Sequence, residues 1–154
     1  MRHHYNLKIV WTGNTGSGTS TYTGYGRDHT IEAEGKPVLL GSADPAFRGD
    51  VTKYNPEELF LASLSACHML WYLHFCSEAG IKVTEYSDRA EGTLAVDSTG
   101  SGRFTGVLLK PLVRVSENNM KEAALDLHQK AHQYCFIANS CNFPVKGQPR
   151  ILVE

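Results

Sequence analysis

The chain has few cysteines, no run of like charges and no long apolar segment. Its 16 acidic and 15 basic residues nearly cancel, so the charge favours neither a nucleic acid nor an anionic membrane surface as a partner. The segment from Met1 to Lys8 lacks the apolar core of a signal sequence, and no apolar run approaches the about 20 residues that span a bilayer. We therefore expect a cytoplasmic protein that binds neither nucleic acid nor a membrane.

The cysteines are also too few, and too far apart, for a disulfide scaffold. They are Cys67, Cys76, Cys135 and Cys141, with no pair of the C-x-x-C type. A domain of 154 residues buries about 68–70% of its unfolded surface and needs no disulfide for stability. We predict a single domain over residues 1–154, with thiols that rest reduced and are free for chemistry.

The pattern of strands and helices predicts the fold class. Strand patterns are followed by a helix, further strands, a second helix and a last strand. The strands are expected at 5–11, 19–25, 30–33, within 83–115 and at 148–154, with a loop-rich passage over 34–54 and a turn at 97–102. Pro111 indicates an edge strand or a bulge. This order predicts an α+β fold with antiparallel sheet packed against two main helices.

The first helix has a clear beginning in the sequence. Asn55 is a good N-cap, Pro56 suits the first helical position, and Glu58 completes a capping box. We expect this helix to run to Ala79 and to end at Gly80.

The middle section of this helix is rich in small residues, Ala and Ser. We therefore expect one face of the helix to pack closely against another element. That face carries Leu59, Ser63, Ala66, Cys67, Leu70 and His74. Ser116 is predicted to cap the second helix, at 117–132.

Cys67 is the candidate nucleophile, although a cysteine on an apolar helix more often only packs. Its reactive form is the thiolate, which a nearby cation favours. Arg27, in a Gly-rich segment, could supply that charge, with Glu57 orienting the guanidinium. Taken alone, Arg27 fits an exposed loop and Glu57 a carboxylate that stabilises a helix N-terminus. His68 follows the thiol directly and points about 100° away around the helix, so we expect it to be structural or interfacial.

A second thiol could condense with a sulfenic acid at Cys67. Cys135 lies just past the second helix and Cys141 follows it closely, so both are candidates. Cys76 lies about 13 Å along the helix from Cys67, too far for a disulfide. We expect Cys76 to serve in packing.

Together these segments resemble the OsmC/Ohr family of thiol-dependent organic hydroperoxide reductases over nearly the whole chain. The resemblance is carried by Gly26-Arg27-Asp28, Asn55-Pro56-Glu57-Glu58-Leu59, Ser65-Ala66-Cys67-His68 and Ala131-His132-Gln133-Tyr134-Cys135. The most specific part is the N-P-E segment with a cysteine ten residues after its glutamate. The histidine after Cys67 resembles the OsmC branch. Phe136 stands where well-characterised members have a proline after the second cysteine.

The resemblance implies an OsmC-like fold and an intertwined homodimer whose active sites use both chains. It implies that Cys67 attacks the peroxide and that Cys135 resolves the product as a Cys67–Cys135 disulfide. It also implies that Arg27 and Glu57 form an ion pair that activates the thiolate and positions the peroxide. The expected activity is that of a thiol peroxidase.

The resemblance further implies an organic hydroperoxide substrate and a dithiol reductant, such as a dihydrolipoyl group or a lipoylated protein. No cofactor and no metal are expected. The aromatic residues Phe60, Trp71 and Phe136, with the apolar residues around Cys67, favour the organic tail of a hydroperoxide over hydrogen peroxide.

Other functions remain open on the sequence. A metal site would use Cys67, His68, His74 and Cys76, although their spacing matches no common zinc arrangement. A cysteine-nucleophile hydrolase or transferase would recruit His128 or His132 as its base. A third alternative is a non-catalytic, ligand-binding member of the same fold.

Overall fold

The computed structural model describes all residues, 1–154. Two α-helices, nine strands and three short 3-10 helices make up the chain, so the predicted α+β class is confirmed. The chain forms two compact units, residues 1–59 and 60–154, which are described separately. One domain over the whole chain stays a prediction.

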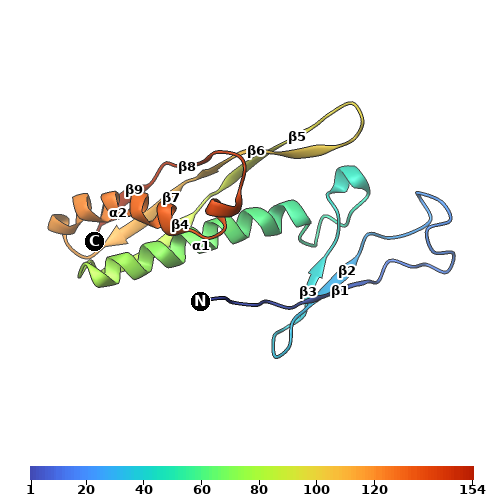
Figure 1. Cartoon of the computed structure of the whole chain (residues 1–154), viewed down its shortest axis with the longest axis horizontal. Helices are drawn as coiled ribbons and strands as arrows, with labels where there is room; N and C mark the ends of the chain where they lie inside the picture. Colours follow the sequence, from blue (N-terminus) through green and yellow to red (C-terminus); the bar gives the residue numbers. More distant parts are fainter. The chain divides into compact units, whose positions relative to one another are not determined.

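The first unit is built on a three-stranded antiparallel sheet in the order β1-β2-β3 (Figure 1). Its elements are β1 (Lys8–Trp11), β2 (His29–Glu32), β3 (Leu39–Gly41) and the short helix η1 (Pro45–Phe47). The strand predicted at 19–25 is wrong, because this segment forms successive turns. The carboxamide of Asn14 accepts hydrogen bonds from the N–H groups of Gly16 and Gly18, and Gly24 N–H donates to the carbonyl of Thr21. These local bonds take the backbone groups that a hairpin would have used.

The first unit buries no large apolar side chain. Its exposed apolar residues include Leu7, Ile9, Leu40 and Val51. Its side-chain contacts include hydrogen bonds from Lys53 to Asp28 and to Asp50. A unit of this size with so little apolar burial is not expected to be stable by itself.

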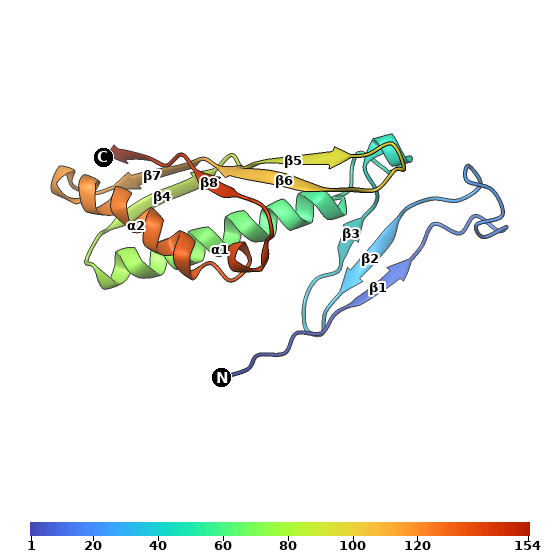
Figure 2. The same cartoon turned by 45° about the horizontal axis from the view of Figure 1, so that its top comes forward.

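In the second unit, α1 and α2 lie side by side on the same side of the strands (Figures 1 and 2). The helices are α1 (Pro56–Glu78), whose first turn belongs to the first unit, and α2 (Lys121–Tyr134). The other elements are β4 (Val83–Asp88), β5 (Glu91–Val96), β6 (Gly102–Leu109), β7 (Pro111–Val115), η2 (Asn118–Met120), η3 (Ala138–Ser140), β8 (Val145–Gly147) and β9 (Arg150–Val153). The strands form two sheets, β4-β7-β9 and β5-β6-β8. The sheets are mixed rather than wholly antiparallel as predicted, because β8 and β9 each pair in parallel with a preceding strand.

Helix α1 begins as predicted. The N–H of Glu58 donates to Asn55 Oδ1 at 2.8 Å, and the N–H of Asn55 donates to Glu58 Oε2 at 3.1 Å. These two bonds form the expected capping box. The helix ends at Glu78, one residue before the predicted end, and Gly80 follows with a φ of 69°. Glycine adopts this left-handed conformation without the strain of a Cβ atom, which suits a helix end.

The buried face of α1 is not the face that was predicted to pack closely. Its buried residues are Leu64, His68, Tyr72, Phe75 and Cys76. Tyr72, Phe75 and Cys76 share a core with Val113 and Val115 of β7, so the predicted packing role of Cys76 is confirmed. The face of Cys67 stays open, with Cys67 half-buried and Leu70 62% exposed. The strands and α2 cover only the side of the helix that carries these buried residues.

Both boundaries of the second helix, its predicted cap and the predicted place of Pro111 differ from the structure. Helix α2 begins at Lys121 rather than 117, because η2 precedes it, and it extends past 132 to Tyr134. Ser116 does not cap it, since its hydroxyl lies 3.8 Å from the sulfur of Met120. Pro111 is neither in an edge strand nor at a bulge. It is the first residue of β7, the central strand of its sheet, where a missing N–H is tolerated.

By length and composition alone, α1 could cross a membrane. The prediction that no apolar run approaches that length is therefore wrong for this segment. However, the core helix of a globular domain passes the same test, and Leu64, His68 and Tyr72 of α1 are buried inside the protein.

Candidate active site

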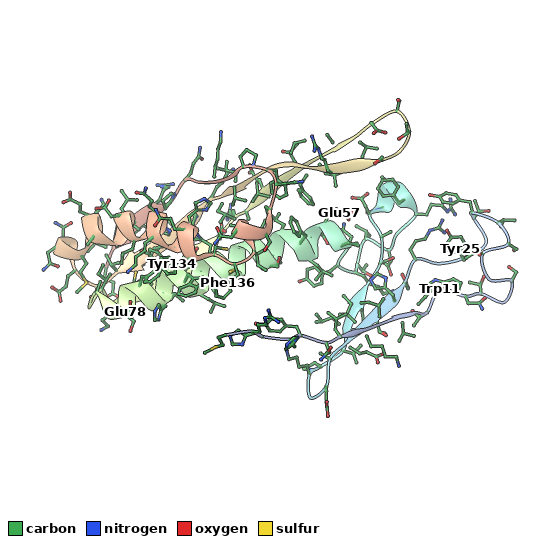
Figure 3. The ribbon with its side chains drawn as sticks, viewed as in Figure 1. Trp11, Tyr25, Glu57, Glu78, Tyr134 and Phe136 are labelled. Atoms are coloured by element: carbon green, nitrogen blue, oxygen red, sulfur yellow. The ribbon has the colours of Figure 1, made fainter.

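Cys67 lies beside an apolar pocket on the open face of α1. The pocket has a volume of about 370 Å³ and is lined by Cys67, Leu70, Trp71 and His74 of α1 and by Phe136, which follows α2. The ring of Phe136 meets the ring of Trp71 edge-on, with the centroids 5.4 Å apart. Figure 3 shows Tyr134 and Phe136 where the end of α2 passes over α1. An apolar pocket beside a thiol suits a ligand with an apolar tail.

Cys135 is buried, and its thiol meets the thiol of Cys67. It is the C-cap residue directly after α2, as expected from its place in the sequence. Its sulfur accepts a hydrogen bond from the N–H of Ala138 at 3.4 Å, and the Cys67 thiol lies beside it. Burial raises the pKa of the Cys135 thiol, and the adjacent Cys67 thiol raises it further. Cys135 is therefore a neutral thiol at neutral pH, beside Cys67.

The other two thiols point elsewhere. The Cys141 thiol donates to the carbonyl of Ile137 at 3.2 Å, and partial burial raises its pKa. Cys76 lies in the core beside Tyr72, where burial raises its pKa as well. Of the two candidates for the second thiol, the structure brings Cys135 to Cys67.

Arg27 and Glu57 belong to the first unit. The guanidinium of Arg27 donates to the carbonyls of Tyr25 and Tyr22 at 2.5 and 2.8 Å. It also lies over both of their rings, 4.0 Å from the centroid of Tyr25 and 4.6 Å from that of Tyr22. Glu57 is half-buried in the first turn of α1. No ion pair joins Arg27 to Glu57 in this structure, so their roles at Cys67 stay predictions.

His68 bonds with His128 of α2. Nε2 of His68 lies 3.0 Å from Nδ1 of His128, and both side chains are buried. Burial lowers the pKa of His68 to about 4 and that of His128 to about 3. Both rings are therefore neutral at neutral pH. This position matches the structural role expected for His68.

The sequence predicted His128 only as a possible base, and its pairing with His68 appears only in the structure. One feature of the sequence pointed to burial of His128. It is spaced four and three residues from Ala124 and Ala131, and these three residues form the buried face of α2.

The residues of the alternative sites do not come together. For the metal alternative, His68 bonds with His128, Cys76 lies in the core, and Nε2 of His74 lies 3.4 Å from Oε1 of Glu78. For the hydrolase alternative, His128 is hydrogen-bonded to His68. The other candidate base, His132, makes no hydrogen bond with a thiol, since those of Cys135 and Cys141 bond with Ala138 and Ile137. His74 shares the pocket of Cys67 but lies about 10 Å further along the helix, too far to take a proton from the thiol directly.

Comparisons with known proteins identify the family. The OsmC-like protein family model matches residues 49–149, and no curated protein matches the chain. A solved OsmC-like protein of unknown function from Vibrio cholerae is 32% identical, with a TM-score of 0.85 over 97% of this chain and 100% of that chain. An organic hydroperoxide resistance protein from Elizabethkingia anophelis is 22% identical, with a TM-score of 0.68 over 100% of both chains. One from Bacillus subtilis is 23% identical, with a TM-score of 0.63 over 95% of this chain and 98% of that chain. The family model and the likeness in fold to solved OsmC-like proteins agree, and the chain belongs to the OsmC-like family.

Proposed function

We propose that this protein is a thiol peroxidase that reduces organic hydroperoxides to alcohols. The observation that carries the proposal is the contact between the thiols of Cys67 and Cys135 beside an apolar pocket. Membership of the OsmC-like family supports it. So does the likeness in fold to proteins described as organic hydroperoxide resistance proteins.

In the first step, the Cys67 thiolate attacks the distal oxygen of the hydroperoxide. The O–O bond breaks, the sulfur becomes a sulfenic acid, and the departing alkoxide takes a proton to become the alcohol. The organic tail lies against Leu70, Trp71 and Phe136, which line the pocket. Phe60, which was expected to contribute to this surface, packs instead on Phe104 and Phe143.

In the second step, the sulfur of Cys135 attacks the sulfenic sulfur of Cys67. A disulfide forms, and the hydroxyl group leaves with the thiol proton as water. A dithiol then reduces this disulfide through thiol exchange and is itself oxidised to a disulfide. We propose a dihydrolipoyl group or a lipoylated protein as that reductant. Because burial keeps Cys135 protonated, it does not compete with Cys67 for the peroxide.

The roles proposed for Arg27 and Glu57 follow from charge. The guanidinium favours the thiolate form of Cys67 because a nearby cation stabilises the negative sulfur. Glu57 orients that guanidinium without taking part in proton transfer.

The proposal includes a homodimer in the cytoplasm, without nucleic-acid or membrane partners. It is supported by the exposed apolar residues of the first unit, such as Leu7, at 65% exposure, and Val51, at 80% exposure. Such exposed apolar surface gains free energy when a partner buries it. A second copy of the chain is the partner that we propose to cover it.

Intact-mass measurement before and after about one equivalent of an organic hydroperoxide tests the proposal. The parent protein should lose two hydrogens as the disulfide forms. Cys67→Ser should stay a folded dimer without peroxide turnover, and unchanged turnover in that variant would end the proposal. Ester hydrolysis that survives replacement of both Cys135 and Cys141 would favour the hydrolase alternative, and a bound metal found by elemental analysis would favour the metal alternative.

A further inference from the structure

Two buried hydrogen bonds between side chains of α1 and groups of α2 join the helices. One is the bond between Nε2 of His68 and Nδ1 of His128 at 3.0 Å, and the other runs from the hydroxyl of Tyr72 to the carbonyl of Ala124 at 3.0 Å. The remaining contacts between these helices include apolar and aromatic packing, such as that of Trp71 and Phe75 on Tyr134. Apolar burial has no preferred direction, whereas each of these two hydrogen bonds requires a particular alignment of the helices; Nζ of Lys130 also lies over the ring of Phe75, 4.0 Å from its centroid.

The hydrogen bond between His68 and His128 depends on the alignment of α1 and α2, because neither ring has another polar partner. His68 is 5% and His128 6% exposed. Nδ1 of His68 and Nε2 of His128 are both buried without a hydrogen-bond partner. A shift of either helix would therefore leave both rings buried without any hydrogen bond, which is strongly unfavourable. The ring of Tyr72 stacks on that of His128, with the centroids 3.9 Å apart, so both bonds belong to one packed group.

This pair lies on the same two helices as the thiols, with His68 one residue from Cys67 on α1 and His128 about two turns before Cys135, which follows α2. A disulfide forms only when the two Cα atoms lie within a range about 2.4 Å wide, and a helix that slides by one turn, about 5.4 Å, exceeds it. The alignment fixed at the histidines therefore decides whether the thiols meet.

We propose that the His68–His128 pair is a positioning device that holds α1 and α2 in the alignment that brings Cys67 to Cys135. The pair does not take protons from the thiols, because its one close polar contact is within the pair itself. The catalytic meaning of this inference rests on the proposed peroxidase function, whereas the positioning effect can be measured without peroxide.

The test is the midpoint potential of the Cys67–Cys135 disulfide in dithiothreitol redox buffers, with the pair identified by peptide mass mapping. A double variant, His68→Leu with His128→Leu, removes the bond but keeps apolar volume. It should lower the equilibrium constant for the disulfide about tenfold, which makes the potential less negative by about 30 mV. Gln129→Leu, an exposed residue of α2 without a side-chain hydrogen bond, is the matched control and should keep the parent potential.

Two single variants separate positioning from packing if the leucine pair fails to fold. In His128→Asn the amide nitrogen takes the place of Nδ1 and can still bond with His68. In His128→Gln it takes the place of Nε2 and cannot. The asparagine variant should keep the parent potential, and the glutamine variant should shift it in the same direction as the leucine pair.

A parent potential in the leucine pair, or equal potentials in the two single variants, would overturn the inference and leave the histidines as packing residues. So would a parent protein that forms no Cys67–Cys135 disulfide in these buffers. If the potentials shift as expected but hydroperoxide never produces the disulfide, the positioning stands and the proposed peroxidase function fails.

Discussion

Acid should destabilise this protein through the buried histidine pair. Burial lowers the pKa of His68 from 6.5 to about 4, whereas in the unfolded chain the residue titrates near its ordinary value. The folded chain therefore binds fewer protons between these two values. Stability is complete above about pH 6.5 and falls as the pH drops toward about 4.

The size of this effect follows from the pKa of His68. A folded pKa of about 4 against 6.5 in the unfolded chain removes about 3 kcal/mol of unfolding free energy by pH 4. His128 shifts in the same direction, but it shares a hydrogen bond with His68, so we take the value for one histidine as the expected size. Typical domains have only about 5–15 kcal/mol of stability, so the loss is readily measured.

The carboxylates titrate in a different window. Hydrogen bonds from Lys53 hold the pKa of Asp28 below 3.8, and those from Thr52 and Lys53 do the same for Asp50. Stability from these groups is present above their unfolded pKa and is lost only as the pH falls further. The loss between about pH 6.5 and about pH 4 can thus be assigned to histidine.

The assay is urea unfolding in steps from about pH 7 to about pH 4, at one fixed protein concentration because association changes apparent stability. The double variant His68→Gln with His128→Asn has no titrating group in the core and should lose about 3 kcal/mol less than the parent over this range. His74→Gln, at an exposed histidine of the same helix, should follow the parent. Parallel curves for the parent and the double variant would refute the reasoning.

Three further predictions concern the proposed site. Cys135→Ser should consume about one equivalent of peroxide and then stop at a sulfenic acid or over-oxidise; intact mass decides, and the same behaviour in Cys141→Ser alone would reassign the second thiol. Arg27→Met should slow Cys67 alkylation at neutral pH, with partial recovery in alkali where more thiolate forms, and Glu57→Gln should show a milder defect; alkylation profiles identical to the parent would remove Arg27 from the site. Phe136→Ala should lower kcat/KM for long-chain alkyl hydroperoxides by about tenfold and leave hydrogen peroxide unaffected, since each buried methylene contributes about 0.8 kcal/mol; an equal loss for both substrates would contradict the proposed tail contact.

Much of the local structure could be predicted from the sequence. The start of α1 depends on Asn55 and Glu58, which bond with each other three residues apart, and its end depends on Gly80. The place of Cys135 just past α2 was likewise a local feature. Such signals are complete within one or two helical turns, so no knowledge of the rest of the chain is needed. The combined motifs also identified the family.

Features that depend on distant residues were predicted less well. The buried face of α1 was misassigned because small residues beside Cys67 suggested close packing, whereas the strands and α2 cover the face of Tyr72 and Phe75. Strand β8 was missed because three residues carry little periodicity, and its pairing with β6 is what defines it. The parallel pairings of β8 and β9 follow from chain connections that no short window contains.

The sequence by itself determined the family and the α+β class, and it named four candidate site residues. Only the tertiary structure decided between Cys135 and Cys141 as the neighbour of Cys67, and only it paired His68 with His128 across 60 positions of sequence. Both outcomes depend on how α1 and α2 align. That alignment is fixed by buried contacts between residues far apart in the chain, whose energies depend on packing and burial rather than on local sequence.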